Sequence, residues 1–239
     1  MSKALVLNSG GVDSTTCVGL AVQKYGKENV ITASLYYGQK HDKELKCAQK
    51  IADYYGVKHI EEDISNVMKY AKDVCTLMKG GKDIEHKSYV EQIEENGEGR
   101  VATYVPFRNG LLLSIATAYA DSLFPGEEVE VYYGAHADDA AGQAYADCSP
   151  EFADAMDKAI NIGTYGKITI SRPLINMNKA GVVKTGLAIG VPYELTWSCY
   201  EGGEKACGTC GTCIDRINAF KANGMEDPIE YFDNNVKKL

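Results

Sequence analysis

A strand, a glycine turn and a helix follow one another at the start of the chain, and this stretch constrains the fold more than any other. Residues 4–7 are an apolar run of strand length, and residues 14–26 keep helical spacing and end at a glycine. Between them, the turn Ser9-Gly10-Gly11 leaves backbone N–H groups open at the positive end of the helix dipole. The stretch therefore predicts an anion site within a βα unit.

Asp13 is the unusual member of this stretch, because a carboxylate next to a bound phosphate repels it. A divalent cation between the two groups removes that repulsion, and Mg²⁺ is the usual cation beside phosphates. The hydroxyl groups of Ser9 and Ser14 add hydrogen-bond donors to the turn. We therefore predict a site for a polyphosphate, with Asp13 as a ligand to its Mg²⁺.

The run from Ser9 to Ser14 resembles the pyrophosphate loop of the N-type ATP pyrophosphatases, which cleave ATP between its α and β phosphates and adenylate a carbonyl oxygen. It is not a Walker loop, because no Gly-Lys-Ser or Gly-Lys-Thr follows the glycines. The resemblance implies that ATP is bound by Ser9, Gly10, Gly11, Val12, Asp13 and Ser14. An ordinary βα turn is the alternative, and the pair Asp13-Ser14 between a strand and a helix favours the ATP site.

Apolar runs of strand length alternate with helical patterns along the rest of the chain. Further strands are expected over residues 30–36, 58–64, 128–134 and 167–171. Such alternation predicts an α/β fold with a Rossmann-like, doubly wound parallel sheet of five strands, and the loop implies the adenine nucleotide alpha-hydrolase type of this fold. Ligands bind at the carboxyl ends of the strands in such sheets, and there we expect Tyr36 to frame the adenine of ATP.

Four of the eight cysteines fall within one short segment, at the spacing C-x7-C-x2-C-x2-C. They are Cys199, Cys207, Cys210 and Cys213. Four thiolates satisfy the tetrahedral coordination of Zn²⁺ and leave no open position, so the pattern predicts a structural zinc knuckle. An iron–sulfur cluster and disulfides are the alternatives. The other cysteines are scattered singly, as is usual in a reducing compartment, and this disfavours disulfides.

The chain has 239 residues and a formal net charge of −8 at pH 7. That charge argues against a broad nucleic-acid surface, and the longest apolar runs are far too short for a membrane span. We expect a nucleotide-binding domain over 1–195, with a polar insertion at 65–104 that contains a short helix near 67–77. The zinc knuckle and a helix, over 196–239, are expected to pack as part of the same domain. The first strand leaves no room for a signal peptide, so we expect a cytoplasmic protein.

The loop and the cysteine segment together resemble the 7-cyano-7-deazaguanine synthase family, which makes preQ0 in queuosine biosynthesis. The further pieces that match this family in order are residues 37–41 with Glu44, residues 105–109, residues 138–148, and residues 173–174 with Lys179. The resemblance spans nearly the whole chain. One piece departs from it, because the loop at 139–148 is longer than in many members and has Ala146 where proline is usual. This departure concerns the substrate contacts more than the chemistry.

The resemblance implies an ATP-dependent ligase that converts 7-carboxy-7-deazaguanine and ammonia to the 7-nitrile, through an adenylated carboxylate and an amide. No glutaminase domain is evident, so free ammonia is the expected nitrogen source. The expected catalytic residues are Asp13, Lys179, which stabilises charge on the α-phosphate, and Arg108, which meets phosphate or the substrate carboxylate. The residues expected to bind the substrate are Arg108, Asn109, Asp139, Tyr145 and Asp147.

Plainer roles and other functions stay open at this point. Lys179 is alternatively a solvated lysine, and Arg108 the partner of a structural carboxylate. Other enzymes with this loop modify tRNA or use a 7-deazaguanine to modify a macromolecule, and a zinc-stabilised nucleotide-binding protein would not catalyse at all. The acidic charge disfavours tRNA, whereas Asp13 with Lys179 favours catalysis. We expect a homodimer whose partners are ATP, ammonia and 7-carboxy-7-deazaguanine, with no nucleic acid and no membrane.

Overall fold

The first strand of the chain lies in the middle of a parallel sheet. The computed structural model describes residues 2–81, 83–87, 91, 101–140 and 144–238, and in these ranges five strands pair in the order β3-β2-β1-β4-β5. The strands are β1 (Lys3–Leu7), β2 (Val30–Tyr36), β3 (Lys58–Asp63), β4 (Val129–Tyr132) and β5 (Ile168–Ser171). The predicted doubly wound sheet of five parallel strands is confirmed.

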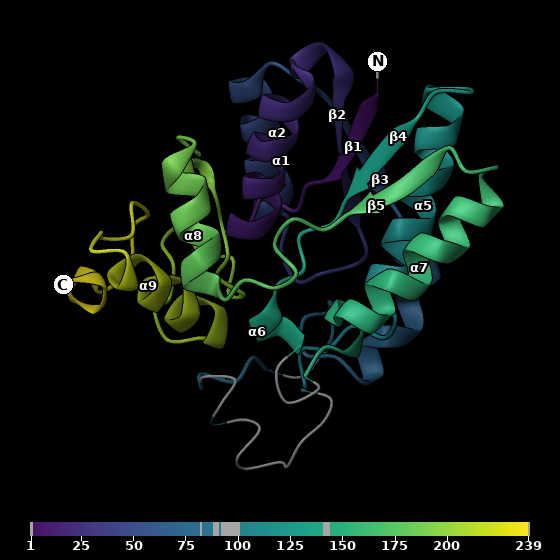
Figure 1. Cartoon of the computed structure of the whole chain (residues 1–239). Coiled ribbons are helices and arrows are strands. Elements are labelled where there is room, and N and C mark those ends of the chain that lie inside the picture. The colour runs from purple at the N-terminus through teal and green to yellow at the C-terminus, as the bar shows by residue number, and fades with distance from the viewer. Residues whose placement is uncertain (1, 82, 88–90, 92–100, 141–143, 239) are drawn as a thin grey trace.

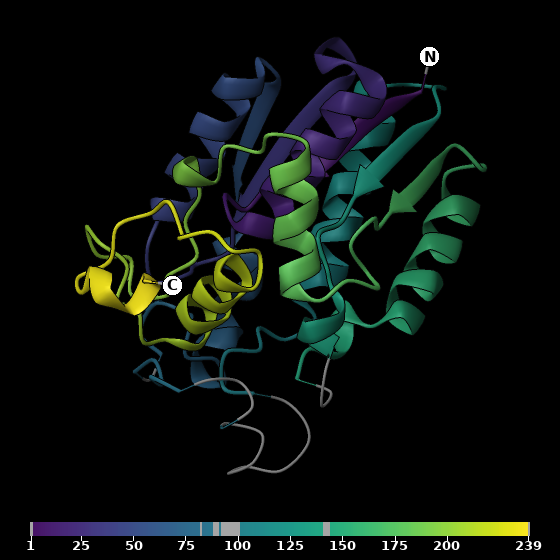
Figure 2. The same cartoon turned by 60° about the vertical axis from the view of Figure 1, so that its left-hand side comes forward.

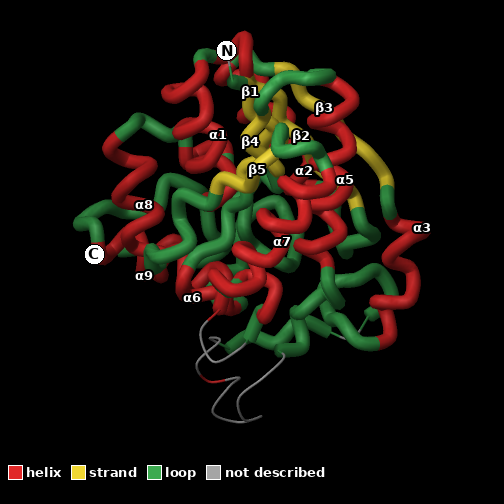
Figure 3. The backbone as a smooth tube through the Cα atoms, turned by 45° about the vertical axis from the view of Figure 1, so that its right-hand side comes forward, coloured by secondary structure: helices red, strands yellow, loops and turns green. Residues whose placement is uncertain are grey.

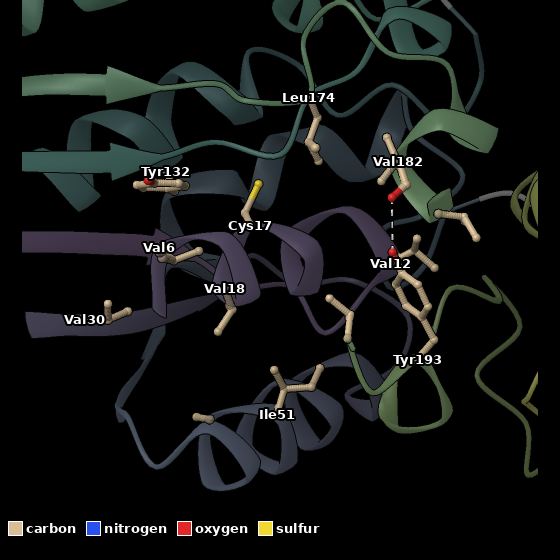
Figure 4. Packing of buried hydrophobic residues seen from close by; sticks show 14 of the residues in the cluster. Val6, Val12, Cys17, Val18, Val30, Ile51, Tyr132, Leu174, Val182 and Tyr193 are labelled. Atoms are coloured by element: carbon tan, nitrogen blue, oxygen red, sulfur yellow. Dashed lines mark hydrogen bonds between the residues drawn. The ribbon is translucent and has the colours of Figure 1, made fainter. Parts of the chain in front are cut away.

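Helices cover both faces of this sheet (Figure 1). The longer ones are α1 (Val12–Tyr25), α2 (Lys43–Tyr55) and α8 (Lys179–Ala188) on one face, and α5 (Arg108–Leu123) and α7 (Pro150–Gly163) on the other. Successive side chains of a strand point to opposite faces, so Ala4 and Val6 pack with the first layer and Leu5 with the second. Figure 4 shows Val6 in the first of these clusters, together with Ile51 from α2.

The helix α9 and several shorter elements complete the described part of the chain. They are α3 (Ser65–Met68), α6 (Ala137–Ala140), α9 (Gly211–Ala222), and the 3-10 turns η1 (Lys27–Asn29), η2 (Lys69–Asp73), η4 (Ala146–Cys148), η5 (Tyr193–Leu195) and η6 (Asn234–Lys237). Figure 3 shows α6 below the carboxyl ends of the strands. Every helix in the described ranges is too short or too polar to cross a membrane.

The polar insertion expected at 65–104 lies partly outside the described residues. Its described start holds only α3 and η2, so the helix expected near 67–77 is shorter than predicted. The reason lies in the backbone hydrogen bonds. From Thr76 onward they go to other segments: the N–H of Thr76 donates to the carbonyl of Ala102, and the carbonyl of Leu77 accepts from Lys40. These long-range bonds replace the bonds that a longer helix would make.

A buried ion pair fastens α9 to the segments on either side of it. Arg216 and Asp227 are both fully buried, and Nε of Arg216 lies 2.6 Å from Oδ2 of Asp227. The guanidinium also donates to the hydroxyl of Thr196 at 2.7 Å, and the hydroxyl of Tyr231 donates to Asp227 at 2.6 Å. Figure 2 shows α9 beside α8, and Asn223 donates across this contact to the carbonyl of Ala180.

Replacing Asp227 with alanine is expected to lower the free energy of unfolding by about 3–5 kcal/mol, because the buried guanidinium of Arg216 loses its counter-charge. Asp154→Ala is the matched control. Asp154 also pairs with an arginine, Arg172, but its side chain is 65% exposed, and such a pair contributes less than about 1 kcal/mol. Urea unfolding of both variants measures the two losses. Losses of equal size would contradict a special role for the buried pair.

Candidate active site

A cavity of about 260 Å³ opens at the carboxyl ends of the strands. Its wall combines the loop after β1 (residues 8–14, the first loop), the segment after β2 with α2, the start of α5, the segment after β4, and the start of α8. Residues 197–200 and α9 close it from the side of the cysteine segment. The position agrees with the prediction that ligands bind at the carboxyl edge of the sheet.

Hydrogen bonds within the first loop hold its shape. The N–H of Gly10 donates to Oδ1 of Asn8 at 3.0 Å, and the N–H of Ser9 donates to the hydroxyl of Ser14 at 3.1 Å. Gly10 has a φ of 79°, and a Cβ at this position would lie only 2.3 Å from the backbone oxygen of Glu44. Only glycine tolerates both this φ and this close approach of α2.

The residues predicted to bind ATP fall into two groups. Those that line the cavity are Ser9, Gly11, Asp13 and Ser14. The side chain of Val12 instead packs in the core (Figure 4), and Gly10 forms the contact with α2. The free N–H groups at the start of α1 supply further donors toward an anion.

Lys179, the first residue of α8, reaches across the cavity to the first loop. Its Nζ lies 2.7 Å and 2.6 Å from the two carboxylate oxygens of Asp13, and 3.3 Å from Nε2 of His136. Nε2 of His136 is in turn 3.4 Å from Oδ1 of Asp139. The side chain of Asn178 accepts from the N–H of Gly181 at 2.8 Å and so fixes the start of α8. The result is a connected group of one lysine, one histidine and two carboxylates.

Charge and burial oppose each other in this group. Burial alone would raise the pKa of Asp13, but the charges of Lys179 and His136 outweigh burial and leave that pKa lowered. Burial likewise disfavours the lysine cation, yet Asp13 and Asp139 raise the pKa of Lys179. For Asp139, burial outweighs the attraction of His136 and Lys179, and the pKa of this carboxyl group is raised. Asp13 and Lys179 therefore meet as a charged pair at neutral pH.

Arg108 is the first residue of α5 and also lines the cavity. Its guanidinium donates to the hydroxyl of Tyr37 at 3.1 Å, and its central carbon lies 5.2 Å from the centre of that ring. Phe107, just before it, has a φ of 51°, which is unusual for a residue with a Cβ. The Phe107 ring packs edge-on against Phe152, with the ring centres 6.0 Å apart, and this contact fixes the turn from which Arg108 projects.

Besides Asp139, two carboxyl groups on the cavity wall have raised pKa values, and they lie on different helices. Burial raises the pKa of Glu44, in the first turn of α2, to about 7, and the charge of Arg108 offsets only part of that shift. Burial also raises the pKa of Asp215, on α9, to about 6, with Lys179 opposing it. Each of them therefore exchanges its proton at a pH above the usual range of carboxyl groups.

The residues predicted to bind the substrate are only partly brought together. Arg108, Asn109, Asp139 and Tyr145 line the cavity. Asp147 lies behind the wall, where its carboxylate accepts from the N–H of Asn109 at 3.0 Å and caps the first turn of α5. Tyr36 lies outside the cavity, in a shallow surface hollow beside Asp63 and Lys79, and its neighbour Tyr37 is the tyrosine that lines the cavity.

Sequence reasoning did not single out His136 or Asp215. His136 follows β4 by only a few residues, and this place at a strand end was a usable signal. Asp215 had no such signal, because it reaches the cavity only through the packing of α9 against α8. Glu44 was noted within a matched piece of the family, without a role.

The four cysteines of the C-terminal segment converge as predicted. Their sulfur atoms all lie within 4.8 Å of one another. The N–H groups of Cys207 and Cys210 donate to sulfur atoms of the cluster, each at 3.3 Å, as is favourable for thiolates. A set of four such sulfurs is the donor set of a closed tetrahedral metal site of the zinc type.

The cysteine cluster touches the first loop through Trp197. The backbone N–H of Trp197 donates to the carbonyl of Gly10 at 2.8 Å, and its indole N–H donates to the carbonyl of Cys199 at 2.8 Å. Nζ of Lys43 lies 3.4 Å from the centre of the indole ring and also donates to the carbonyl of Gly203 at 2.6 Å. The cysteine cluster is thus connected to the wall of the cavity through Trp197.

The raised pKa of Glu44 predicts a pH dependence of stability. The folded chain holds a proton on this carboxyl up to about pH 7, whereas the unfolded chain releases it near the ordinary value of 4.5. The folded state therefore loses stability as the pH rises between these values, and the loss is complete above them. The groups around Glu44 are Arg108 on α5, Tyr37 after β2 and Cys199.

We expect Glu44→Gln to raise the free energy of unfolding by about 1–2 kcal/mol at pH 8, after allowance for partial exposure, and to change nothing at pH 4. Urea unfolding at the two pH values measures this difference. Glu28→Gln, in the exposed turn η1, is the control and should have no effect at either pH. If the free energy of unfolding is raised equally at pH 8 and at pH 4, the charge of Glu44 is not the cause.

Comparisons with known proteins agree with this geometry. The family model described as "Queuosine biosynthesis protein QueC" matches residues 3–224. A 7-cyano-7-deazaguanine synthase from Psychromonas ingrahamii is 41% identical over 232 residues, which cover 97% of this chain and 98% of that relative. The corresponding synthase from Archaeoglobus fulgidus is 39% identical over 241 residues, covering 98% of this chain and 94% of the relative.

Among solved structures, the NMN synthetase from Francisella tularensis has a similar fold. The similarity covers 99% of this chain and 87% of that one, with a TM-score of 0.51 and 14% sequence identity. At this level of identity the likeness concerns the fold alone. The described residues thus combine a five-stranded parallel sheet with a four-cysteine cluster near the C-terminus.

Proposed function

The chain belongs to the queuosine biosynthesis protein QueC family, and from this premise we propose how its residues perform the reaction of a 7-cyano-7-deazaguanine synthase. It is an ATP-dependent ligase of queuosine biosynthesis. The observation that carries the proposal is the meeting of Asp13 in the first loop with Lys179 in a cavity at the carboxyl edge of the sheet.

The proposed reaction joins 7-carboxy-7-deazaguanine to ammonia and ends at the 7-nitrile. A carboxylate is a poor electrophile, so its oxygen first attacks the α-phosphate of ATP, forming the acyl adenylate and releasing pyrophosphate. Ammonia then displaces AMP and gives the amide. A second ATP activates the amide oxygen in the same way, and loss of AMP and of the two protons on nitrogen leaves the nitrile. Each activation needs a site that binds pyrophosphate as a leaving group, and the first loop has the donors for it.

In this proposal the first loop holds the β and γ phosphates through its N–H groups and the hydroxyls of Ser9 and Ser14. Lys179 turns from Asp13 to the α-phosphate and stabilises the charge that develops there. The carboxylate of Asp13, one-quarter exposed, is then free to hold Mg²⁺, whose charge would offset that of the phosphates.

Arg108 is proposed to bind the carboxylate of the substrate, because it lines the cavity and its guanidinium has five donors. Among the described residues only Tyr37 engages one of them, which leaves others for a bidentate contact. Asp139 and Tyr145, which line the same cavity, are proposed to contact the deazaguanine ring. For Asp147, whose carboxylate caps α5, the proposed role is to orient Asn109 toward the substrate.

The four-cysteine cluster is proposed to hold one structural Zn²⁺, since a closed set of four sulfurs leaves no position for a substrate. We also propose that residues 1–195 and 196–239 act as one domain, because the N–H of Trp197 donates to the carbonyl of Gly10 and the guanidinium of Arg216 donates to the carbonyl of Tyr193. A cytoplasmic location and a homodimer complete the proposal.

Mass spectrometry of the full chain incubated with ATP, Mg²⁺, ammonium and 7-carboxy-7-deazaguanine tests the proposed function. The 7-nitrile should form, and Asp13→Ala should not form it. Consumption of ATP without change in the acid would overturn the substrate assignment. A folded, metal-loaded protein that changes neither ATP nor the acid would overturn the ligase reaction itself.

A further inference from the structure

We propose that Glu44 forms the ammonia site, where its carboxylate binds the ammonium ion and takes up the protons that the nitrogen loses on the way to the nitrile. The inference deepens the proposed function and rests on it. Nothing in the comparisons assigns a role to this residue. It is argued from where Glu44 lies, which groups around it are already engaged, and what the chemistry requires.

Glu44 lies in the part of the cavity where the new carbon–nitrogen bond must form. It lines the cavity from the first turn of α2, and α2 packs directly on the first loop at Gly10. If that loop binds the phosphates of ATP, the acyl group joined to the α-phosphate lies next to it. The Glu44 side chain therefore shares a wall with the activated carbonyl group.

Asp13, Lys179 and Arg108 are engaged by direct contacts in the cavity, whereas the Glu44 carboxylate makes none with the described residues there and meets Arg108 only through its charge. Asp13 is paired with Lys179, and Arg108 donates to Tyr37. Within the described part of the chain, the carboxylate of Glu44 makes no hydrogen bond or ion pair. An unpaired carboxylate beside a polyphosphate and an acidic substrate is repelled by both. A small cation bound to Glu44 removes that repulsion, and ammonium is the one cationic substrate of the reaction.

The chemistry requires a base at this place. Ammonia in water at neutral pH is mostly ammonium, which has no lone pair and cannot attack. The first proton passes to Glu44, and the lone pair of the nitrogen then attacks the acyl carbon. The bond between this carbon and the oxygen of AMP breaks, and AMP leaves with the electrons of that bond. Loss of a second proton gives the neutral amide. The two remaining protons leave during the second activation, so the nitrogen sheds four protons in all.

These proton transfers need a carboxyl group that can return each proton to solvent near neutral pH. The raised pKa of Glu44 agrees with this requirement. Asp215 is the rival, since it lines the same cavity and also has a raised pKa. It differs in its surroundings, however, because the charges that act on Asp215 include those of Lys179, Asp138 and Asp139, whereas Glu44 faces Arg108. Asp215→Asn therefore makes the same chemical change in the same cavity and serves as the comparison variant.

The test separates activation from amide formation. Zinc-loaded wild type, Glu44→Gln and Asp215→Asn are assayed for exchange of labelled pyrophosphate into ATP with 7-carboxy-7-deazaguanine and no ammonium. They are then assayed for amide and nitrile formation with ammonium, and for hydroxamate formation with hydroxylamine. Hydroxylamine is a far weaker base, largely unprotonated at neutral pH, and needs no base before it attacks.

For Glu44→Gln we expect pyrophosphate exchange within about twofold of wild type and a fall of kcat/KM for ammonium by about 10²–10⁴-fold. Hydroxamate formation should stay within about threefold, and Asp215→Asn should not show this selective loss. An unchanged kcat/KM for ammonium, or an equal loss with hydroxylamine, would overturn the inference. If the KM for 7-carboxy-7-deazaguanine in the exchange assay rises in Glu44→Gln, Glu44 instead binds the deazaguanine, and the inference is overturned. Wild-type protein without exchange would overturn the proposed function, and this inference with it.

Discussion

Lys179→Met is expected to lower the rate of acid-dependent pyrophosphate exchange by about 10²–10³-fold, because one preorganised donor to the transferring group is lost. Exchange reports the first activation alone, so neither ammonium nor the later steps enter the measurement. The expectation follows from geometry, since Nζ of Lys179 contacts both oxygens of Asp13 and is the ammonium group nearest the first loop among the described residues that line the cavity. Methionine keeps an unbranched side chain, one atom shorter, and removes the charge together with the hydrogen-bond donors of the ammonium group.

Lys184→Met is the matched control for this variant. Lys184 lies on the same helix, α8, but is exposed, and the same substitution there should leave exchange unchanged. Removing Lys179 also leaves Asp13 without its partner, so urea unfolding of both variants is needed to exclude loss of the fold. If Lys179→Met exchanges pyrophosphate at the wild-type rate, the lysine serves only to pair with Asp13.

Cys210→Ser is expected to abolish metal binding and to lower the free energy of unfolding by roughly 5 kcal/mol or more. A structural zinc site contributes about 10 kcal/mol in small zinc domains, and much of it is lost with one ligand. For a chain of this size, such a loss lowers the melting temperature by about 10–20 °C. Cys210 is fully buried and caps the start of α9, so metal loss also loosens the helix that carries Asp215.

Elemental analysis should find one zinc per chain in the wild type and none in Cys210→Ser, and calorimetry gives the two melting temperatures. Cys75→Ser is the control, because Cys75 is buried outside the cluster and its sulfur donates to the carbonyl of Thr103, a bond that a serine can keep. This variant should retain its metal. Iron in place of zinc would favour the iron–sulfur alternative, and full stability of the metal-free protein would refute the structural role.

The sequence predicted those parts of the fold whose signals are local. The strand, turn and helix around Ser9 to Ser14 and the convergence of the four cysteines needed only short-range spacing. The helix expected near 67–77 was too long, because the partners of Thr76 and Leu77 lie far away in the sequence. Local periodicity contains no information about such bonds.

In the candidate site, too, the features that depend on local sequence were predicted and those that depend on distant contacts were not. Tyr36 and Tyr37 are adjacent aromatic residues at the end of β2, and sequence does not tell which of the two side chains faces the cavity. Asp147 is acidic like Asp139, but its carboxylate is taken up by the N–H of Asn109, a contact between residues 38 positions apart. Asp215 depends on how α9 packs. The loop residues were predictable, whereas roles that depend on tertiary packing were not.

The hydrogen bond from Trp197 to Gly10 has a consequence for the order in which the protein is made. The first loop leaves the ribosome well before the group that braces its carbonyl, because Trp197 follows Gly10 by 187 positions, in the segment that leads into the cysteine cluster. A nascent chain therefore carries the ATP loop for most of its synthesis without its brace, its lysine on α8 or its metal. The braced form of the first loop can therefore arise only after the segment around Trp197 has been made.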